Sequence, residues 1–215
     1  FTRPNPWMKP FIPAEFVKTS DTLYCLSQEG RGSATPIVTA LTVAVTEAAV
    51  QWAKKCPGGR LSTPMLIELD EAANVCRWNE LPDMYSHFGS RGINVDTVFQ
   101  SWSQGVARWG DAGMKKLWGA ANVAIYGGGG REDSFLSMLS KIIGVYWQDS
   151  KQTSRSKHGT SRSVSAQSQQ RQIATISDLQ ALPPERMWVF ASGSEPVLAE
   201  KVPYWKNKNI TLTQG

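Results

Sequence analysis

The chain has 215 residues, of which 41% are hydrophobic and 19% charged, and its formal net charge is +5. This composition is typical of a folded protein with one large or two small domains, and it excludes wholesale disorder. No window reaches the 18 uninterrupted apolar residues of a membrane span, and Val38–Trp52 comes nearest. The mild positive charge permits a nucleic-acid partner without requiring one.

The first 20 residues contain four prolines, and we expect an extended lead-in that packs on another part of the protein. Because the sequence opens on Phe1 rather than Met, we expect it to be part of a longer chain. Its three cysteines are widely spaced and form no CxxC or Cys/His cluster. We therefore expect buried, reduced thiols rather than a disulfide framework or a metal site.

Apolar strand patterns and helical patterns then alternate along the chain. After a first short strand at 21–27, strands are predicted at 64–70, 93–99 and 122–126, and helices at 35–55, 78–88, 101–119 and 133–143. This spacing is typical of strand–helix–strand units, which form a parallel sheet covered on both faces. The sequence therefore predicts an α/β fold.

The composition changes abruptly at 148–172 to Ser, Gln, Thr, Arg and Lys, which cannot form a core. We expect a linker, an insertion loop or a two-stranded ribbon. Candidate phosphate contacts are Lys151, Arg155, Lys157 and Arg162. Because no aromatic residues interleave with them, a solvated hairpin is the alternative.

A short helix at 176–182 and a hairpin of 187–191 with 196–199 are expected to close the chain. The predicted organisation is thus a lead-in at 1–20, an α/β region at 21–147, the basic stretch at 148–175 and a closing segment at 176–215.

The sharpest chemical signal is an apolar strand that ends in Asp70 and Glu71. The carboxyl ends of strands are where α/β sheets bind ligands. An aspartate there can hold Mg²⁺ through its water shell, and an adjacent carboxylate can polarise an attacking water. The alternative is an acidic pair that starts a helix, where negative charge is favourable.

Two further polar candidates come from the next predicted strand. Gln100 follows that strand and can reach a γ-phosphate or its water, although the neighbouring Ser101 also fits a helix N-cap. Arg91 lies between glycines before the strand and offers a planar fork for phosphate charge, or is simply solvated.

A phosphate-binding loop is missing from this sequence. No GxxxxGK[ST] motif occurs, and Gly127–Gly130 lacks the spacing of a dinucleotide fingerprint, so we expect a tight turn there. With no Ser or Cys nucleophile signature near either histidine, a catalytic triad is not expected.

The order and spacing of several segments resemble the C-terminal part of the type IV secretion coupling proteins, the TraG/TraD-type conjugative DNA-transfer ATPases with a TraM-recognition region. The matching segments are Leu66–Ala73, Gly89–Val95, Phe99–Gln104, Trp109–Gly110, Ile125–Gly128, Leu182–Pro184 and Gly193–Pro196. The basic run 151–162 corresponds to the polar ribbon of that family. The resemblance covers nearly the whole chain from about residue 23.

The resemblance implies part of a RecA-like ATPase domain, with a parallel sheet flanked by helices. Asp70 and Glu71 would be the Walker B pair, for Mg²⁺ and for water activation, and Gln100 the sensor of the γ-phosphate of ATP. The usual family arginine finger aligns with Gly89, two residues before Arg91, so Arg91 takes the role by a loop shift or another arginine does, with Arg108 and Arg131 as candidates.

The same resemblance implies partners and a location. It implies a ring of copies, single-stranded DNA, a relaxosome or TraM-like accessory protein and secretion-channel components, at the cytoplasmic face of the bacterial plasma membrane through an upstream segment. Because the phosphate-binding loop of the family lies upstream, this chain alone is expected to be inactive. The alternative is a non-catalytic RecA-like adaptor that binds DNA or a relaxosome protein.

Overall fold

The computed structural model describes residues 7–26, 34–155 and 162–206, and the chain divides into two compact units, residues 1–121 and 122–215. Unit 1 contains α1 (Pro13–Phe16), α2 (Thr35–Ala53), η1 (Pro57–Gly59), β1 (Met65–Leu69), α3 (Ala72–Val75), α4 (Leu81–Phe88), η2 (Gly89–Arg91), β2 (Ile93–Thr97) and α5 (Trp102–Ala120). Unit 2 contains β3 (Val123–Tyr126), α6 (Asp133–Ile143), β4 (Val145–Arg155), β5 (Arg162–Gln172), α7 (Ile176–Gln180), β6 (Arg186–Ala191), β7 (Val197–Glu200) and η3 (Tyr204–Lys206).

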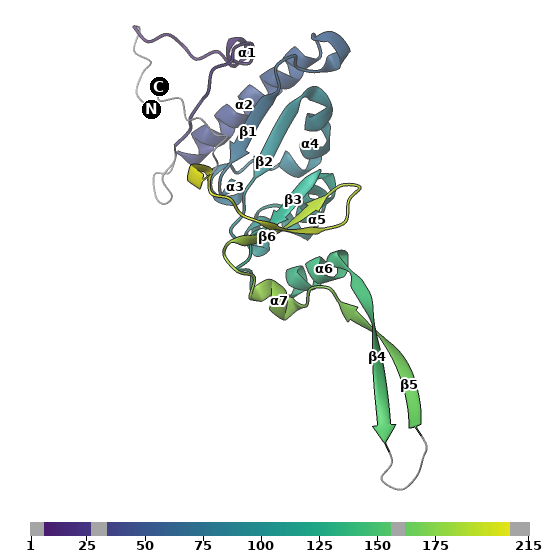
Figure 1. Ribbon diagram of the computed structural model, residues 1–215. Coiled ribbons are helices and arrows are strands. Elements are labelled where there is room, and N and C mark those ends of the chain that lie inside the picture. The colour runs from purple at the N-terminus through teal and green to yellow at the C-terminus, as the bar shows by residue number, and fades with distance from the viewer. Residues whose placement is uncertain (1–6, 27–33, 156–161, 207–215) are drawn as a thin grey trace. The chain divides into compact units, whose positions relative to one another are not determined.

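In unit 1, β1 and β2 form a parallel pair, with Met65 opposite Ile93 and Leu69 opposite Thr97 (Figure 1). Side chains alternate along each strand, so every second residue turns to the same face. The inward residues join a core built with α2, α4 and α5. The buried members of this core are Ala49, Ala53, Leu61, Ile67, Leu69, Ala72, Cys76, Trp78, Leu81, Phe88, Ile93, Met114 and Leu117.

The other face of this pair is open, which differs from the predicted double cover. Leu66 is 60% exposed and Val98 is 50% exposed. The side chains between them are polar, and Glu68 pairs with Asp96 across the strands. The alternation of strands and helices does not indicate an uncovered face, whereas the polar residues at every second position of these strands do.

The raised pKa of Glu68 on this face makes stability depend on pH. Burial, the charge of Asp96 and a hydrogen bond with Asp96 raise the pKa of Glu68 above its ordinary 4.5. As pH rises through 4.5, the unfolded chain releases this proton before the folded chain does, so the free energy of unfolding falls until folded Glu68 also ionises.

We expect Asp96→Asn to reduce this loss between pH 4 and pH 7, because it removes the like charge opposite Glu68. The gain at pH 7 should stay below about 1 kcal/mol, since the pair is exposed. Urea unfolding at both pH values measures it. Glu47→Gln, on the exposed side of α2, is the control, and an equal gain there would contradict the assignment.

The lead-in was predicted to be extended, but Pro13 starts the short helix α1 within it. It does pack on the protein: Val17 lies against the core, and the Lys18 ammonium lies 5.4 Å from the centroid of the Trp52 ring in α2. The strand predicted at 21–27 is wrong for 21–26, which form neither strand nor helix, and Ser27 lies outside the described residues.

Most predicted elements of unit 1 are confirmed with shifted ends. The helix predicted at 35–55 is α2. By length and composition alone, α2 is long and apolar enough to cross a membrane. In this structure one set of its side chains is buried: Val38, Val45, Thr46, Ala49 and Ala53. The helix predicted at 78–88 begins only at Leu81, and α3 was not predicted. The helix α5 is bent at Gly110, where φ is 71° and ψ is 169°.

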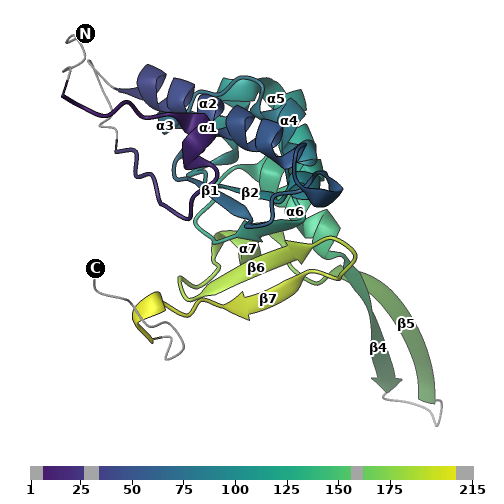
Figure 2. The same ribbon diagram turned by 90° about the horizontal axis from the view of Figure 1, so that it is seen from above.

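In unit 2, β3 belongs to an antiparallel sheet of order β3-β6-β7, and not to the predicted parallel sheet. Tyr126 pairs with Trp188, more than 60 residues away along the chain, and both side chains are buried. Such a long-range pairing leaves no local pattern in the sequence. The predicted closing hairpin is confirmed as β6 and β7, which lie side by side in Figure 2.

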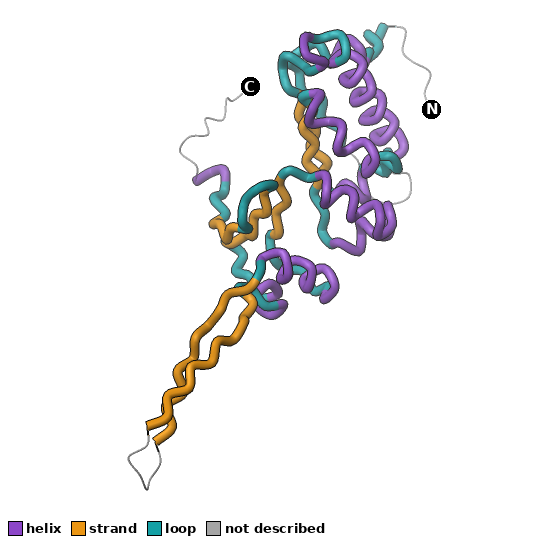
Figure 3. Tube along the Cα trace, turned by 90° about the vertical axis from the view of Figure 1, so that its right-hand side faces the viewer, coloured by secondary structure: helices purple, strands orange, loops and turns teal. Residues whose placement is uncertain are grey.

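The polar stretch forms the two-stranded ribbon, one of the three predicted alternatives. The strands β4 and β5 pair antiparallel over eleven residues each, from Val145 opposite Gln172 to Arg155 opposite Arg162, and they twist about each other (Figure 3). The tight turn predicted after β3 is also present, with positive φ at Gly128 and Gly129. Tyr126 holds it by accepting a hydrogen bond from the Gly130 amide at 3.1 Å.

Candidate functional site

The carboxyl ends of β1 and β2 bring the predicted site residues Glu71 and Gln100 together. Val98 N–H donates to the Leu69 carbonyl at 3.0 Å, and Ala72 N–H donates to the Val98 carbonyl at 3.1 Å. These two backbone bonds extend the contact between the two chain segments beyond the ends of the strands. The side chains that follow each strand therefore lie beside one another.

The amide of Gln100 donates from Nε2 to Glu71 Oε1. The other carboxylate oxygen, Oε2, lies 3.5 Å from Asn74 Nδ2, which donates to it. Gln104 Nε2 in turn donates to Gln100 Oε1 at 3.4 Å. The result is a chain of one carboxylate and three amides across the ends of two parallel strands.

Neither Asn74 nor Gln104 was among the predicted site residues, although the helical spacing of both indicates their position. Asn74 is three residues after Glu71, and Gln104 is four residues after Gln100, so each returns to the same side of its turn. Ser101 is indeed the N-cap of α5, and its Oγ accepts from the backbone N–H of Gln104, so the alternative interpretation of this residue is correct and compatible with the polar cluster.

Asp70 is exposed beside this cluster, and within the described ranges its side chain has no hydrogen bond or ion pair. A free carboxylate at the end of a strand fits a hard cation such as Mg²⁺, which keeps most of its waters and takes one or two carboxylates. The described residues contain no group of three or more His, Cys, Asp or Glu that could hold a metal by themselves.

The backbone of Glu71 is in the left-handed region, with φ 51° and ψ 49°, and it is the one non-glycine residue with positive φ in the described part of the chain. This conformation costs an ordinary side chain about 1–2 kcal/mol. Strain of this kind gathers at functional sites, where it fixes the direction of a side chain.

We expect Glu71→Gly to be more stable than Glu71→Ala by about 1 kcal/mol, because both remove the carboxylate and only glycine relieves the strain. Thermal or urea unfolding of this 215-residue chain measures the difference. The matched pair Lys115→Gly and Lys115→Ala in α5 should give the opposite order. If alanine is the better residue at both sites, position 71 is not strained.

Arg91 is not brought to this cluster. It precedes β2, at the opposite end of the strand from Gln100, and its guanidinium Nη1 donates to the Gly59 carbonyl at 3.4 Å. The neighbouring Arg60 donates from Nη1 to the Gly89 carbonyl at 2.7 Å. The two arginines thus tie the loop before β1 to the turn before β2.

The candidate phosphate contacts lie in the ribbon of unit 2. In the backbone register, Lys151 is opposite Ala166, and Arg155 is opposite Arg162. Lys157 lies outside the described residues.

Structural comparison places this chain among α/β proteins that share the fold of conjugative coupling proteins. It is similar to "Bacterial conjugative coupling protein TrwBdeltaN70" in its unbound monoclinic form, with 16% identity and a TM-score of 0.56 over 78% of this chain and 38% of that one. It is also similar to "Plasmid coupling protein TrwB" in complex with ADP and Mg²⁺ (16% identity, TM-score 0.54) and in complex with the ATP analogue ADPNP (15%, 0.54), each over 78% of this chain and 37% of that one.

The sequence identifies the family. The family described as "TraM recognition site of TraD and TraG" matches residues 64–184, more than half of the chain, and the chain belongs to this family. The predicted resemblance is therefore confirmed. A comparison with curated proteins found no match. The chain spans less than two fifths of the length of the coupling-protein structures that it resembles.

Proposed function

We propose that this chain supplies one half of an ATP site in a DNA-translocating coupling ATPase of conjugation or type IV secretion. The observation that carries the proposal is the hydrogen bond between Gln100 and Glu71 at the carboxyl ends of β1 and β2. Family membership and the fold shared with nucleotide-bound coupling proteins support it. The proposal includes a RecA-like sheet, of which β1 and β2 are two strands, and a phosphate-binding loop outside this chain.

In this proposal, the two carboxylates have separate roles. Asp70, exposed and unpaired within the described ranges, would hold Mg²⁺. The cation would supply charge neutralisation at the phosphates. Glu71 orients the attacking water and accepts its proton, and the amides of Gln100 and Asn74 aim its carboxylate.

The hydrogen-bond chain gives Gln100 the role of a sensor. Its amide bonds to Glu71 in this structure and can instead donate to a γ-phosphate oxygen, which would release one oxygen of Glu71 for water. Gln104, which donates to Gln100 Oε1, holds the side chain at the end of the strand in either arrangement.

The arginine finger acts on the site of a neighbouring copy in a ring. The location of Arg91 at the opposite end of β2 suits this, because the residue cannot reach the cluster of its own subunit. Arg108 suits the role less well, since hydrogen bonds from its Nη2 to the Arg77 carbonyl and to Asn79 Oδ1 fix the position of its guanidinium within unit 1. Arg131 is the remaining candidate from the sequence.

The proposed setting includes partners and a location in the cell. The description of the matched region suggests an accessory protein of the TraM type as partner, and the coupling-protein fold suggests single-stranded DNA and components of a secretion channel. In this proposal, the basic ribbon is the candidate DNA contact, and the whole protein acts at the cytoplasmic face of the plasma membrane.

Magnesium-dependent ATP hydrolysis by the full-length protein, with and without single-stranded DNA, tests the proposal beside this chain alone. We expect DNA-stimulated turnover in the full-length protein and none in the 215-residue chain. No turnover in a folded full-length protein would overturn the proposal in favour of a non-catalytic adaptor.

A further inference from the structure

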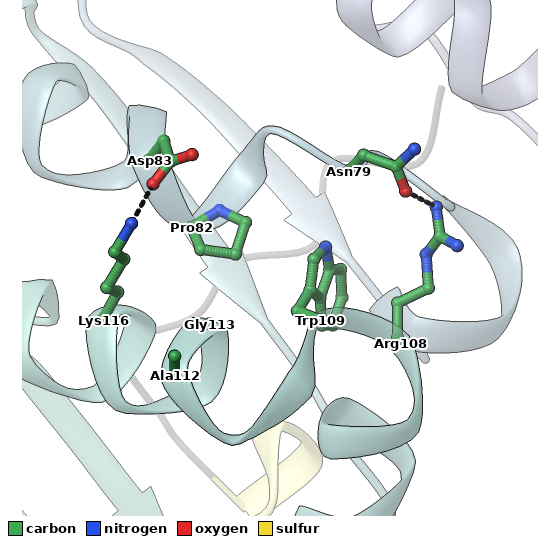
Figure 4. Close-up of a pocket in the computed structure, with 8 residues that line it drawn as sticks. All are labelled: Asn79, Pro82, Asp83, Arg108, Trp109, Ala112, Gly113 and Lys116. Carbon is green, nitrogen blue, oxygen red and sulfur yellow. Dashed lines mark hydrogen bonds and ion pairs between the residues drawn. The ribbon is translucent and has the colours of Figure 1, made fainter.

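A pocket of about 360 Å³ lies between the start of α4 and the helix α5 in unit 1 (Figure 4), and no residue of the carboxylate cluster lines it. Its size is at the lower end of the range of about 300–1,000 Å³ for ligand sites. The floor is apolar, from Pro82, Trp109 and Gly113, and charged side chains stand at both ends, Arg108 at one and Lys116 at the other.

The bend of α5 builds the floor of this pocket. Because Gly110 leaves the helical conformation, the Trp109 side chain lies against Gly113, where an added Cβ would be 2.6 Å from Trp109 Cβ and 3.5 Å from Pro82 Cγ. The indole Nε1 donates to the Trp78 carbonyl at 2.7 Å, and the ring packs edge-on against Phe99 at 5.9 Å between centroids. These contacts fix the position of the Trp109 ring in the floor.

The two ends of the pocket differ in charge balance. The Lys116 ammonium is 2.5 Å from Asp83 Oδ1, so its charge has a partner. Arg108 Nη2 donates only to neutral oxygens, the Arg77 carbonyl and Asn79 Oδ1. Its Nε is buried without a hydrogen-bond partner, and Arg108 forms no ion pair within the described ranges. A half-buried guanidinium without a counter-ion favours an incoming anion.

We propose that this pocket binds an acidic peptide segment of a partner protein, with one carboxylate on Arg108 and an adjacent apolar side chain on the Trp109 floor. A single uncompensated cation with Asp83 at the rim suits one carboxylate, whereas nucleic-acid binding relies on several phosphate contacts. The carboxylate cluster contributes no residue to this pocket, and the proposal does not depend on the nucleotide site, in which Arg108 is only a less suited candidate for the arginine finger.

The test is fluorescence anisotropy with this chain and a fluorescein-labelled ten-residue peptide of alternating Glu and Leu. We expect the peptide to bind, and its counterpart with Gln in place of Glu to bind about tenfold more weakly. Arg108→Gln should lower the affinity for the Glu peptide about tenfold. Lys115→Gln, the loss of an equal charge on the outer side of the same helix, should change affinity less than twofold.

Since Arg108 also holds Arg77 and Asn79, a second variant keeps the test decisive if Arg108→Gln unfolds. Ala112→Glu leaves those contacts intact and places a carboxylate in the pocket. The new carboxylate should repel the Glu side chains of the peptide and occupy their place, and so lower the affinity about tenfold. The proposal would be overturned if the Glu peptide did not bind or if both peptides bound equally. It would also be overturned if Ala112→Glu bound the Glu peptide with unchanged affinity. Displacement of the peptide by an equimolar fifteen-residue oligothymidine would overturn it as well, and would assign the pocket to phosphate.

Discussion

Glu71→Gln in the full-length protein is expected to lower the rate of ATP hydrolysis by about 10²- to 10⁴-fold, the usual contribution of a general base. The amide keeps the size of the side chain, but it cannot take the proton of the attacking water. Asp70 is untouched, so binding of Mg²⁺ and ATP should remain within a few-fold. Steady-state turnover and equilibrium binding of a fluorescent ATP analogue measure the two effects separately.

The control for this variant is Asn74→Ala, which removes the donor to the other carboxylate oxygen and leaves the base in place. Its loss of turnover should be much smaller, at about tenfold or less. If Glu71→Gln hydrolyses ATP at the normal rate, the catalytic role of Glu71 is refuted, whatever the fold of the protein. If it loses ATP binding as well, the residue acts in binding rather than in proton transfer.

The candidate site was largely predictable because it depends on where strands end. The apolar run before Asp70 and the run before Gln100 each locate the carboxyl end of a strand, and parallel strands bring those ends to one edge. The same logic places Arg91, which precedes its strand, at the opposite edge. The left-handed backbone of Glu71 was not predictable, because nothing in the residue type favours it.

The fold was less predictable where pairing is long-range. The segment that forms β3 has the same local pattern as the parallel strands, and only its partner, β6, decides that it is antiparallel. Likewise, the composition of the basic stretch is compatible with a linker or a ribbon, because its residues have no core to join. The helix α1 was not predicted because four prolines in the lead-in indicate extended chain. Pro13 instead occupies the first turn of the helix, where proline is favourable.

Phe88→Ala is expected to destabilise unit 1 by about 3–5 kcal/mol, as large-to-small changes in well-packed cores do. The side chain is only 2% exposed, and its ring centroid lies 5.8 Å from that of Trp78 in the main core. It ends α4 immediately before the turn that leads into β2. Because small domains have about 5–15 kcal/mol of stability in total, a loss of this size should be plain in urea unfolding followed by circular dichroism.

Two control variants test whether the loss of stability comes from the buried volume of the Phe88 side chain. Phe88→Leu keeps most of the buried volume and should lose clearly less, and Tyr24→Ala, at a side chain 83% exposed, should stay within about 0.5 kcal/mol. Equal effects of Phe88→Ala and Tyr24→Ala would contradict the core described for unit 1. The contrast with position 71 is also informative. If the proposed roles hold, Glu71→Gln should remove ATP hydrolysis from a stable protein. Phe88→Ala should keep the proposed catalytic groups and lose activity only as the strand ends that hold Glu71 and Gln100 together unfold.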